Sequence, residues 1–342
     1  YDKKLIVLKQ FFMDSYLYLI IKEKYKMYNM DIQWFPGHMT KTKRMMSENL
    51  SLVDVVIELI DARIPFSSKN PDIDELAKNK FRIIILNKAD LANEKSTEIW
   101  KKYYEDKGFK VIVANSLSGS GINAVTAKAK ELMADKIKKQ QERGRLFVPI
   151  RAMIVGIPNV GKSTFINRYV GKNTAKTGDK PGVTRGKQWI RIKKDLELLD
   201  TPGILWPKFD DKEVGLKLAF IGSINDDILD NEILCKNLIG FFMERAPELI
   251  TKRYGIEINE GDTPDNIFDK IGVKRGFVSK GGQIDGSRTS KIVIDEFRGG
   301  KIGKITLELP EDISRMAENT AKEKELKKQK DSQRKEDYKK TK

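Results

Sequence analysis

Short apolar runs rich in β-branched residues alternate with helical stretches through the first two thirds of the chain. Five such runs predict buried strands, at residues 53–60, 81–86, 110–114, 152–155 and 196–199. The stretches between them predict helices at residues 43–49, 72–80, 94–107, 122–143 and 164–169. Apolar strands that alternate with helices are typical of a doubly wound, mostly parallel sheet. We therefore predict an α/β fold for this part of the chain.

Beyond residue 207 the strand signal fades and helical patterns dominate. Helices are expected at residues 212–222, 231–246 and 289–298. Gly299 and Gly300 follow the last of them and are typical of a helix end. The pattern predicts a smaller, mainly α-helical C-terminal domain over residues 207–315.

The two ends of the chain differ from these folded parts. Residues 316–342 are charged and poor in apolar residues, and residues 321–342 carry ten Lys/Arg against five Asp/Glu, so we expect a basic, disordered tail. Residues 1–29 show no clear period, whereas Met30 opens a segment typical of a native amino terminus. We interpret residues 1–29 as a non-native or disordered leader and place the first domain at residues 30–206.

The charge of the chain indicates what kind of partner to expect. Lys and Arg outnumber Asp and Glu by 65 to 49, a formal net charge of +16, which favours a polyanion such as RNA. No run of about 18 uncharged apolar residues is present, so we expect no membrane-spanning helix. A single cysteine, Cys235, excludes an intramolecular disulfide and fits a reducing cytoplasm.

A phosphate-binding loop is predicted directly after the strand at 152–155. Residues 156–163 read Gly-Ile-Pro-Asn-Val-Gly-Lys-Ser, which matches the eight-residue motif at every required position. Glycines let the backbone approach a phosphate chain with its N–H groups aimed into one concavity. We expect Lys162 to meet the β- and γ-phosphates and Ser163 to bind magnesium. The nucleotide contacts predicted here are Gly156, Pro158, Asn159, Val160, Gly161, Lys162, Ser163 and Thr164.

Two further segments complete the predicted magnesium site. Asp200 follows the strand at 196–199, where phosphate-loop enzymes place the acid that orients magnesium. Gly203 would offer its N–H to the γ-phosphate, so that loss of this phosphate frees the segment beyond it. Thr184, in the Gly-containing stretch 180–186, is the candidate for a further magnesium ligand; an ordinary loop threonine is the alternative.

A base-recognition motif precedes the phosphate loop in the chain. Asn87, Lys88 and Asp90 follow the strand at 81–86, where ligands of open α/β sheets bind. A carboxylate at Asp90 can accept from two donors of guanine, a pair that adenine lacks. We expect Asn87 to accompany it and the Lys88 stem to cover the base. Asn115 and Ser116, after the next strand, would close over the base from the other side. The predicted ligands are GTP and GDP.

With this order of motifs, the chain resembles the circularly permuted GTPases, and most closely the ribosome biogenesis GTPase A family. The resemblance extends from residue 30 to about 310 and is carried by residues 33–39, 61–65, 87–90, 156–163, 200–203 and 222–224. It implies a GTP phosphohydrolase that binds a late precursor of the large ribosomal subunit and its ribosomal RNA. Hydrolysis would be coupled to subunit maturation and factor release. It also implies dependence on K⁺, because Asn159 matches the phosphate-loop asparagine of potassium-using GTPases. We expect a cytoplasmic monomer.

The residue that orients the attacking water is missing from its usual place. Ile204 follows Gly203, where Ras-like enzymes carry a glutamine, and an isoleucine has no group that hydrogen-bonds water. The resemblance assigns this role to His38, the only histidine, so that His38 and Lys162 are the predicted catalytic residues. The alternative is a histidine that only docks the amino-terminal segment or contacts RNA.

Two other classes of function are weighed against ribosome assembly. A signalling or membrane-associated GTPase would call for a lipidation motif or a basic amphipathic helix, and neither is evident in the sequence. A nucleotide-binding RNA module that does not hydrolyse GTP would have no use for a complete magnesium set. The sequence therefore favours an assembly GTPase.

Overall fold

The computed structural model describes residues 39–145, 148–171, 188–192, 196–201, 205, 209, 211–318 and 320–321. The predicted leader at 1–29, His38, Thr184 and Gly203 lie outside the described residues, as does most of the predicted tail.

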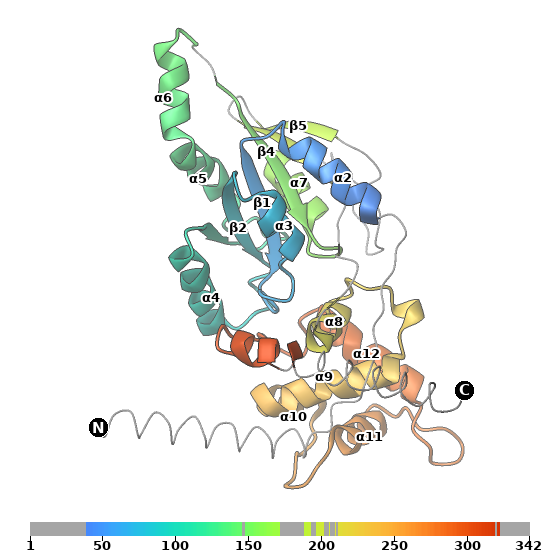
Figure 1. Cartoon of the computed structure of the whole chain (residues 1–342). Helices are drawn as coiled ribbons and strands as arrows, with labels where there is room; N and C mark the ends of the chain where they lie inside the picture. The colour runs from blue at the N-terminus through green and yellow to red at the C-terminus, as the bar shows by residue number, and fades with distance from the viewer. Residues whose placement is uncertain are drawn as a thin grey trace, which may run out of the picture. The chain divides into compact units, whose positions relative to one another are not determined.

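Within the described residues, six strands form one sheet in the order β3-β2-β1-β4-β6-β5 (Figure 1). Their bounds are β1 Val55–Asp61, β2 Phe81–Asn87, β3 Lys110–Val113, β4 Ile150–Gly156, β5 Gln188–Ile192 and β6 Leu196–Asp200. Neighbouring strands are parallel except β5, which runs antiparallel to β6. The predicted mostly parallel α/β sheet is confirmed.

Strand β1 occupies the centre of the sheet and is buried at all seven positions, as expected of a strand covered on both faces. Its register places Asp61 opposite Asn87 at the end of β2. On its other side, Leu59 pairs with Gly156 at the end of β4. The carboxyl ends of β1, β2 and β4 therefore meet at one edge of the sheet, and the base motif and the phosphate loop both begin there.

Helices cover the sheet on both sides (Figure 1). Helices α2 (Met39–Leu50) and α3 (Pro71–Leu76) pack through an apolar cluster against residues of β1, β4 and β6. Helix α4 (Glu94–Asp106) packs through Trp100 and Tyr104 against residues of β1, β2 and β3. Helix α5 (Ala124–Leu132) contacts β2 and β3, and α7 (Lys162–Val170) contacts β4 and β5.

Two elements differ from the sequence-based expectation. The helix expected at 122–143 is interrupted at Met133, whose side chain is buried, so that α6 (Ala134–Glu142) is a separate helix without a buried residue. Strand β5 is absent from the predicted set. It buries Ile190 and Ile192 but exposes Trp189, and this alternation suits an edge strand rather than a continuous apolar run.

The chain divides into two compact units, with a different division from the one we expected. One unit comprises residues 226–303, whereas the expected helical domain covered 207–315. Helix α8 (Lys212–Phe220) belongs to the unit that holds the sheet, and it is buried at every position from its second residue on.

The segment that follows residue 303 also belongs to the sheet unit. The backbone N–H of Ile305 donates to Leu91 O at 3.1 Å, and that of Leu307 donates to Arg63 O at 2.8 Å. These bonds fix the segment beside the loops that follow β1 and β2. Sequence periodicity does not report such long-range contacts, which explains the different boundaries.

The helical unit at 226–303 is built around α9. Its elements are η1 Asp226–Ile228, α9 Asn231–Arg245, α10 Pro247–Tyr254, α11 Pro264–Lys274 and α12 Gly286–Arg298. Helix α9 packs against α10, α11 and α12, and Phe242 meets Phe297 of α12 edge to face at a centroid distance of 6.0 Å. The predicted helical C-terminal part is confirmed. No helix in the described part of the chain has the length and apolarity needed to cross a membrane.

Candidate nucleotide site

The loop between β4 and α7 is shaped by two glycines. A Cβ at Gly156 would lie 2.9 Å from both Leu59 O and Val160 Cγ1, so a larger residue would push the loop off β1. Gly161 has a φ of +92°, and a Cβ there would lie 2.6 Å from Asn87 Nδ2. The loop then enters α7 directly, and the free N–H groups and dipole at a helix start favour an anion.

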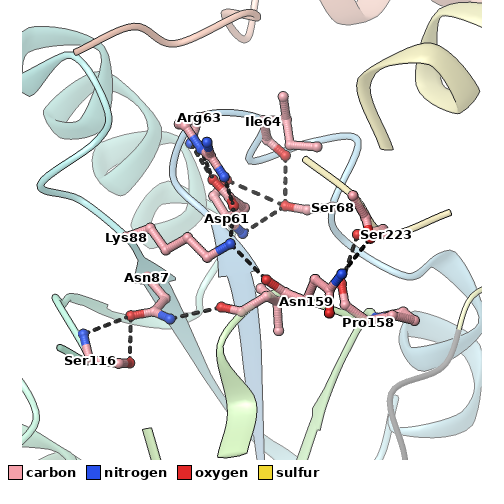
Figure 2. Close-up of polar contacts among 12 residues, drawn as sticks. Asp61, Arg63, Ile64, Ser68, Asn87, Lys88, Ser116, Pro158, Asn159 and Ser223 are labelled. Carbon is pink, nitrogen blue, oxygen red and sulfur yellow. Dashed lines mark hydrogen bonds and ion pairs between the residues drawn. The ribbon is translucent and has the colours of Figure 1, made fainter. Parts of the chain in front are cut away.

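Asn87 joins the base motif to two other loops (Figure 2). Its amide nitrogen donates to Val160 O in the phosphate loop at 2.8 Å. Its amide oxygen accepts from Ser116 N at 3.1 Å and from Ser116 Oγ at 2.7 Å. One buried side chain thus sets the spacing between the phosphate loop and the loop that follows β3.

Lys88 makes a second connection to the phosphate loop. Its ammonium group donates to Asn159 O at 2.6 Å and lies 3.2 Å from Asp61 Oδ2 (Figure 2). The backbone of Lys88 has a φ of 58°, in the left-handed region that a non-glycine residue seldom adopts. From this backbone position the single ammonium group of Lys88 reaches both the phosphate loop and Asp61.

Asp61 and Arg63 form a buried ion pair beside Lys88. Arg63 donates through Nε to Oδ1 at 2.9 Å and through Nη2 to Oδ2 at 2.8 Å, a bidentate geometry. Burial alone would raise the pKa of Asp61, but the charges of Arg63 and Lys88 and the hydrogen bonds from Arg63 outweigh it, so the pKa lies well below its usual range. Asp61 is therefore a fixed negative charge that holds Lys88.

Lys162 and Asp200 form an ion pair at the start of α7. Lys162 Nζ lies 2.7 Å from Asp200 Oδ1, and both side chains are buried. Burial lowers the pKa of Lys162 below its usual value, although the charge of Asp200 opposes this shift. The ammonium group of this pair can bind a phosphate, and the carboxylate can bind a metal ion.

The described residues of the predicted magnesium site fit that ion. Ser163 offers a hydroxyl oxygen and Asp200 a carboxylate oxygen, the ligand types that magnesium prefers. The end of β6 is fixed to β4, since Thr201 Oγ1 donates to Ile154 O at 2.7 Å. The described residues include no group of three or more His, Cys, Asp and Glu placed to hold a metal.

The remaining predicted contacts lie in two loops and at the start of α7. Asp90 is half-buried in the turn after β2, and Thr164 is half-buried in the first turn of α7. Asn115 Oδ1 accepts from Leu117 N at 2.8 Å and from Ser118 N at 3.1 Å, so its side chain shapes the loop itself. Ser116 contacts the base motif through Asn87, and Ala114 O accepts from Ala89 N of that motif at 3.2 Å.

The structure brings together most of the predicted site and adds residues with no predicted role. Asn87 and Lys88 contact the phosphate loop, and Lys162 contacts Asp200. In the sequence, Asp61 and Arg63 were part of the family resemblance but had no predicted role. Their spacing from Lys88 along the chain does not indicate that Asp61 contacts it. His38, Thr184 and Gly203 lie outside the described residues, so their roles stay predictions.

Comparison with known protein families matches the segment that carries the phosphate loop. Residues 151–237 match the family described as 50S ribosome-binding GTPase. That segment begins in β4 and ends in α9.

Full-length relatives extend the similarity over most of the chain. Ribosome biogenesis GTPase A of Bacillus cereus is 48% identical over 300 residues, which are 87% of this chain and 100% of the relative. The protein of the same name from Thermotoga maritima is 33% identical over 283 residues, 83% of this chain and 96% of the relative. GDP-bound and GNP-bound structures of YlqF from Thermotoga maritima match with TM-scores of 0.55 and 0.54, at 31% and 33% identity; they cover 79% and 80% of this chain and all of their own.

Proposed function

The chain belongs to the ribosome biogenesis GTPase A family and hydrolyses GTP, and from that premise we propose that it acts on a late precursor of the large ribosomal subunit. Hydrolysis at the nucleotide site is coupled to subunit maturation and to release of the protein. In this proposal the protein is a cytoplasmic monomer.

The observation that carries the proposal is the junction at Asn87, which couples a guanine-type motif to a phosphate loop. A protein whose two halves of the site are joined by one side chain can respond to the whole nucleotide rather than to the base or the phosphates alone. The net charge of +16 supplies the attraction to ribosomal RNA, whose phosphates are the dominant charge on the proposed partner.

The residues of the site have distinct proposed roles. Asp90 reads guanine, Asn115 and Ser116 close over the base, and Lys162 binds the β- and γ-phosphates. Ser163, Thr184 and Asp200 would hold magnesium, which when bound would neutralise charge on the phosphates. Gly156, Pro158, Val160, Gly161, Thr164 and Gly203 would contact the nucleotide through their backbone or first helical turn.

Two assignments depend on the family resemblance. Asn159 is the proposed ligand for K⁺, and its amide oxygen is the atom of the right kind, because its amide nitrogen donates to Gly222 O. His38 is the proposed residue that orients the attacking water, since Ile204 offers no polar group.

Co-sedimentation tests the proposed partner. The purified protein, with a non-hydrolysable GTP analogue, is spun with large-subunit precursors, with mature subunits and with liposomes of anionic lipid. We expect it to pellet with the precursors and to stay in the supernatant with the liposomes. Pelleting with liposomes alone would support the membrane-associated class of GTPase instead.

A further inference from the structure

Residues 222–224 are part of the family resemblance but have no role in the site described above. They follow helix α8, far from the phosphate loop in sequence. Ser223 is fully buried, yet its side chain carries a hydroxyl that must find a partner there.

The end of α8 determines where this hydroxyl points. Gly222 N donates to Ala219 O at 3.0 Å, and Ser223 N donates to Leu218 O at 2.9 Å. This pair of bonds is the Schellman motif, which requires a left-handed residue after the helix; Gly222 fills it with a φ of +74°. The chain then turns sharply away from α8, and the carbonyl of Gly222 and the side chain of Ser223 face a neighbouring segment.

The neighbouring segment is the phosphate loop. Ser223 Oγ donates to Pro158 O at 2.7 Å, and the amide nitrogen of Asn159 donates to Gly222 O (Figure 2). The two bonds run in opposite directions between the same two segments. They fix the carbonyl of Pro158 and the side chain of Asn159, whereas Lys88 contacts the backbone carbonyl of Asn159.

Three consecutive carbonyls of the loop are hydrogen-bond acceptors, at Pro158, Asn159 and Val160. Each accepts a hydrogen bond from a side chain outside the loop. In a trans peptide unit the N–H points away from the C=O, so fixing these carbonyls also fixes the three N–H groups that follow them. Backbone N–H groups aimed to one side are what a phosphate chain needs.

We propose that Ser223, together with Gly222, is a positioning residue of the phosphate loop, which holds the N–H of Asn159 in the direction required by the β-phosphate. The end of α8 thereby becomes part of the nucleotide site. This inference rests on the proposed role of residues 156–163 as the phosphate-binding loop.

Nucleotide affinities of Ser223→Ala test the proposal in the full-length protein. A fluorescent GDP analogue reports the Kd for GDP, and displacement by GMP reports the affinity for a ligand that lacks the β-phosphate. Loss of the bond leaves a buried carbonyl unpaired, so we expect the Kd for GDP to rise about tenfold. The affinity for GMP should stay within about twofold of wild type. The thiol of Ser223→Cys is a weak donor of similar size. We therefore expect its Kd for GDP to lie between those of wild type and Ser223→Ala.

Two control variants distinguish the role of Ser223 from a general loss of stability and from an error in the phosphate-loop assignment. Ser67→Ala removes another buried serine hydroxyl of the same unit, one that donates to Glu308 Oε2 at 2.6 Å. It should lower the Tm without changing either affinity. Lys162→Ala should abolish GDP binding, and unchanged binding there would overturn the phosphate-loop assignment itself.

Three results would overturn the role of Ser223 while leaving the site intact. One is a GDP affinity of Ser223→Ala within twofold of wild type, when Lys162→Ala no longer binds. Another is an equal loss of GDP and GMP affinity, which would indicate a general loss of structure. If Ser223→Ala does not fold, wild-type affinities for folded Ser223→Cys would have the same meaning.

Discussion

At the scale of single residues, Asn87 shows why one side-chain type is needed at the centre of the site. Its oxygen accepts from Ser116 and its nitrogen donates to Val160, and these partners lie 29 and 73 residues further along the chain. An amide offers an acceptor and a donor at once, whereas a carboxylate only accepts and an ammonium only donates. Aspartate at this position would lose the bond to the phosphate loop and leave a buried charge.

Asp90 is expected to determine which base is bound. Asp90→Asn replaces an acceptor-only group by one that also donates, which suits xanthine rather than guanine. We expect the Kd for GTP to rise by about 10²-fold or more and the variant to prefer xanthosine triphosphate. Competition against a fluorescent nucleotide measures both affinities, with exposed Asp106→Asn on α4 as the matched control. An unchanged Kd for GTP would show that another residue reads the base.

Asp61 should make stability depend on acid pH in a definite direction. Its folded-state pKa is lowered, so the carboxylate stabilises the fold above its unfolded pKa of about 3.9, and this contribution is lost as the pH falls below that value. Asp61→Asn should cost about 3 kcal/mol at pH 7, since it breaks a buried pair with Arg63. The loss of stability between pH 5 and pH 3 should be shallower than in wild type. Urea unfolding at several pH values measures both, and a slope equal to that of wild type would contradict the account.

His38 is expected to act on hydrolysis and not on binding. His38→Ala should lower single-turnover GTP hydrolysis with saturating large-subunit precursors by roughly 10²-fold or more, the usual effect of losing such a group. The affinity for GTP should stay near that of wild type, because the proposed contact is to water. Wild-type rates would exclude His38 and indicate a group supplied by the ribosome.

At the scale of elements, a strand or helix is predicted best from the sequence when a single hydrophobic pattern extends over its whole length. Strand β1 is apolar at most positions because both of its faces are buried, and so its pattern is unmistakable. Strand β5 lies at the sheet edge with one face exposed, and five alternating residues are too short a signal. The break between α5 and α6 falls at Met133, a buried residue, and a helical period does not report such a break.

The basic tail is an element whose proposed role can be tested by its charge. Residues 321–342 carry ten Lys/Arg against five Asp/Glu, and basic residues that bind RNA phosphates release counterions. Binding to large-subunit precursors should weaken log-linearly with salt, and removal of residues 321–342 should flatten the slope. Filter binding at a series of salt concentrations measures it. An identical slope would move the RNA contact to the folded units.

At the scale of the whole molecule, the motifs were predictable one at a time but their contacts were not. The phosphate loop and the base motif each follow a buried strand, and parallel strands bring their carboxyl ends to one edge. The contacts of Asp61 with Lys88 and of Ser223 with Pro158 depend on loop conformations, including left-handed backbone at Lys88 and Gly222. Hydrophobic periodicity carries no information about such conformations.

The segment that re-enters the sheet unit after residue 303 also depends on contacts between residues far apart in the sequence. Glu308 is fully buried there and accepts from Ser67 N at 2.8 Å and from Lys217 Nζ of α8 at 3.0 Å. Its backbone carbonyl accepts from Trp100 Nε1 at 2.8 Å. Burial alone would lower the pKa of Lys217, but the charges of Glu308 and Glu213 raise it, so Lys217 stays charged. A residue near the end of the chain therefore holds α8 and α4 in place.

Glu308→Gln tests whether this segment stabilises the sheet unit. The variant leaves a buried ammonium with one carboxylate partner fewer, and breaking a buried pair costs about 3 kcal/mol or more. We expect the urea midpoint to fall by an amount that corresponds to this loss, with an unchanged slope. Glu311→Gln, an exposed glutamate three residues further on, is the matched control and should change the free energy of unfolding by less than about 0.5 kcal/mol. If the two variants unfold alike, the buried contacts of Glu308 do not contribute to the stability of the sheet unit.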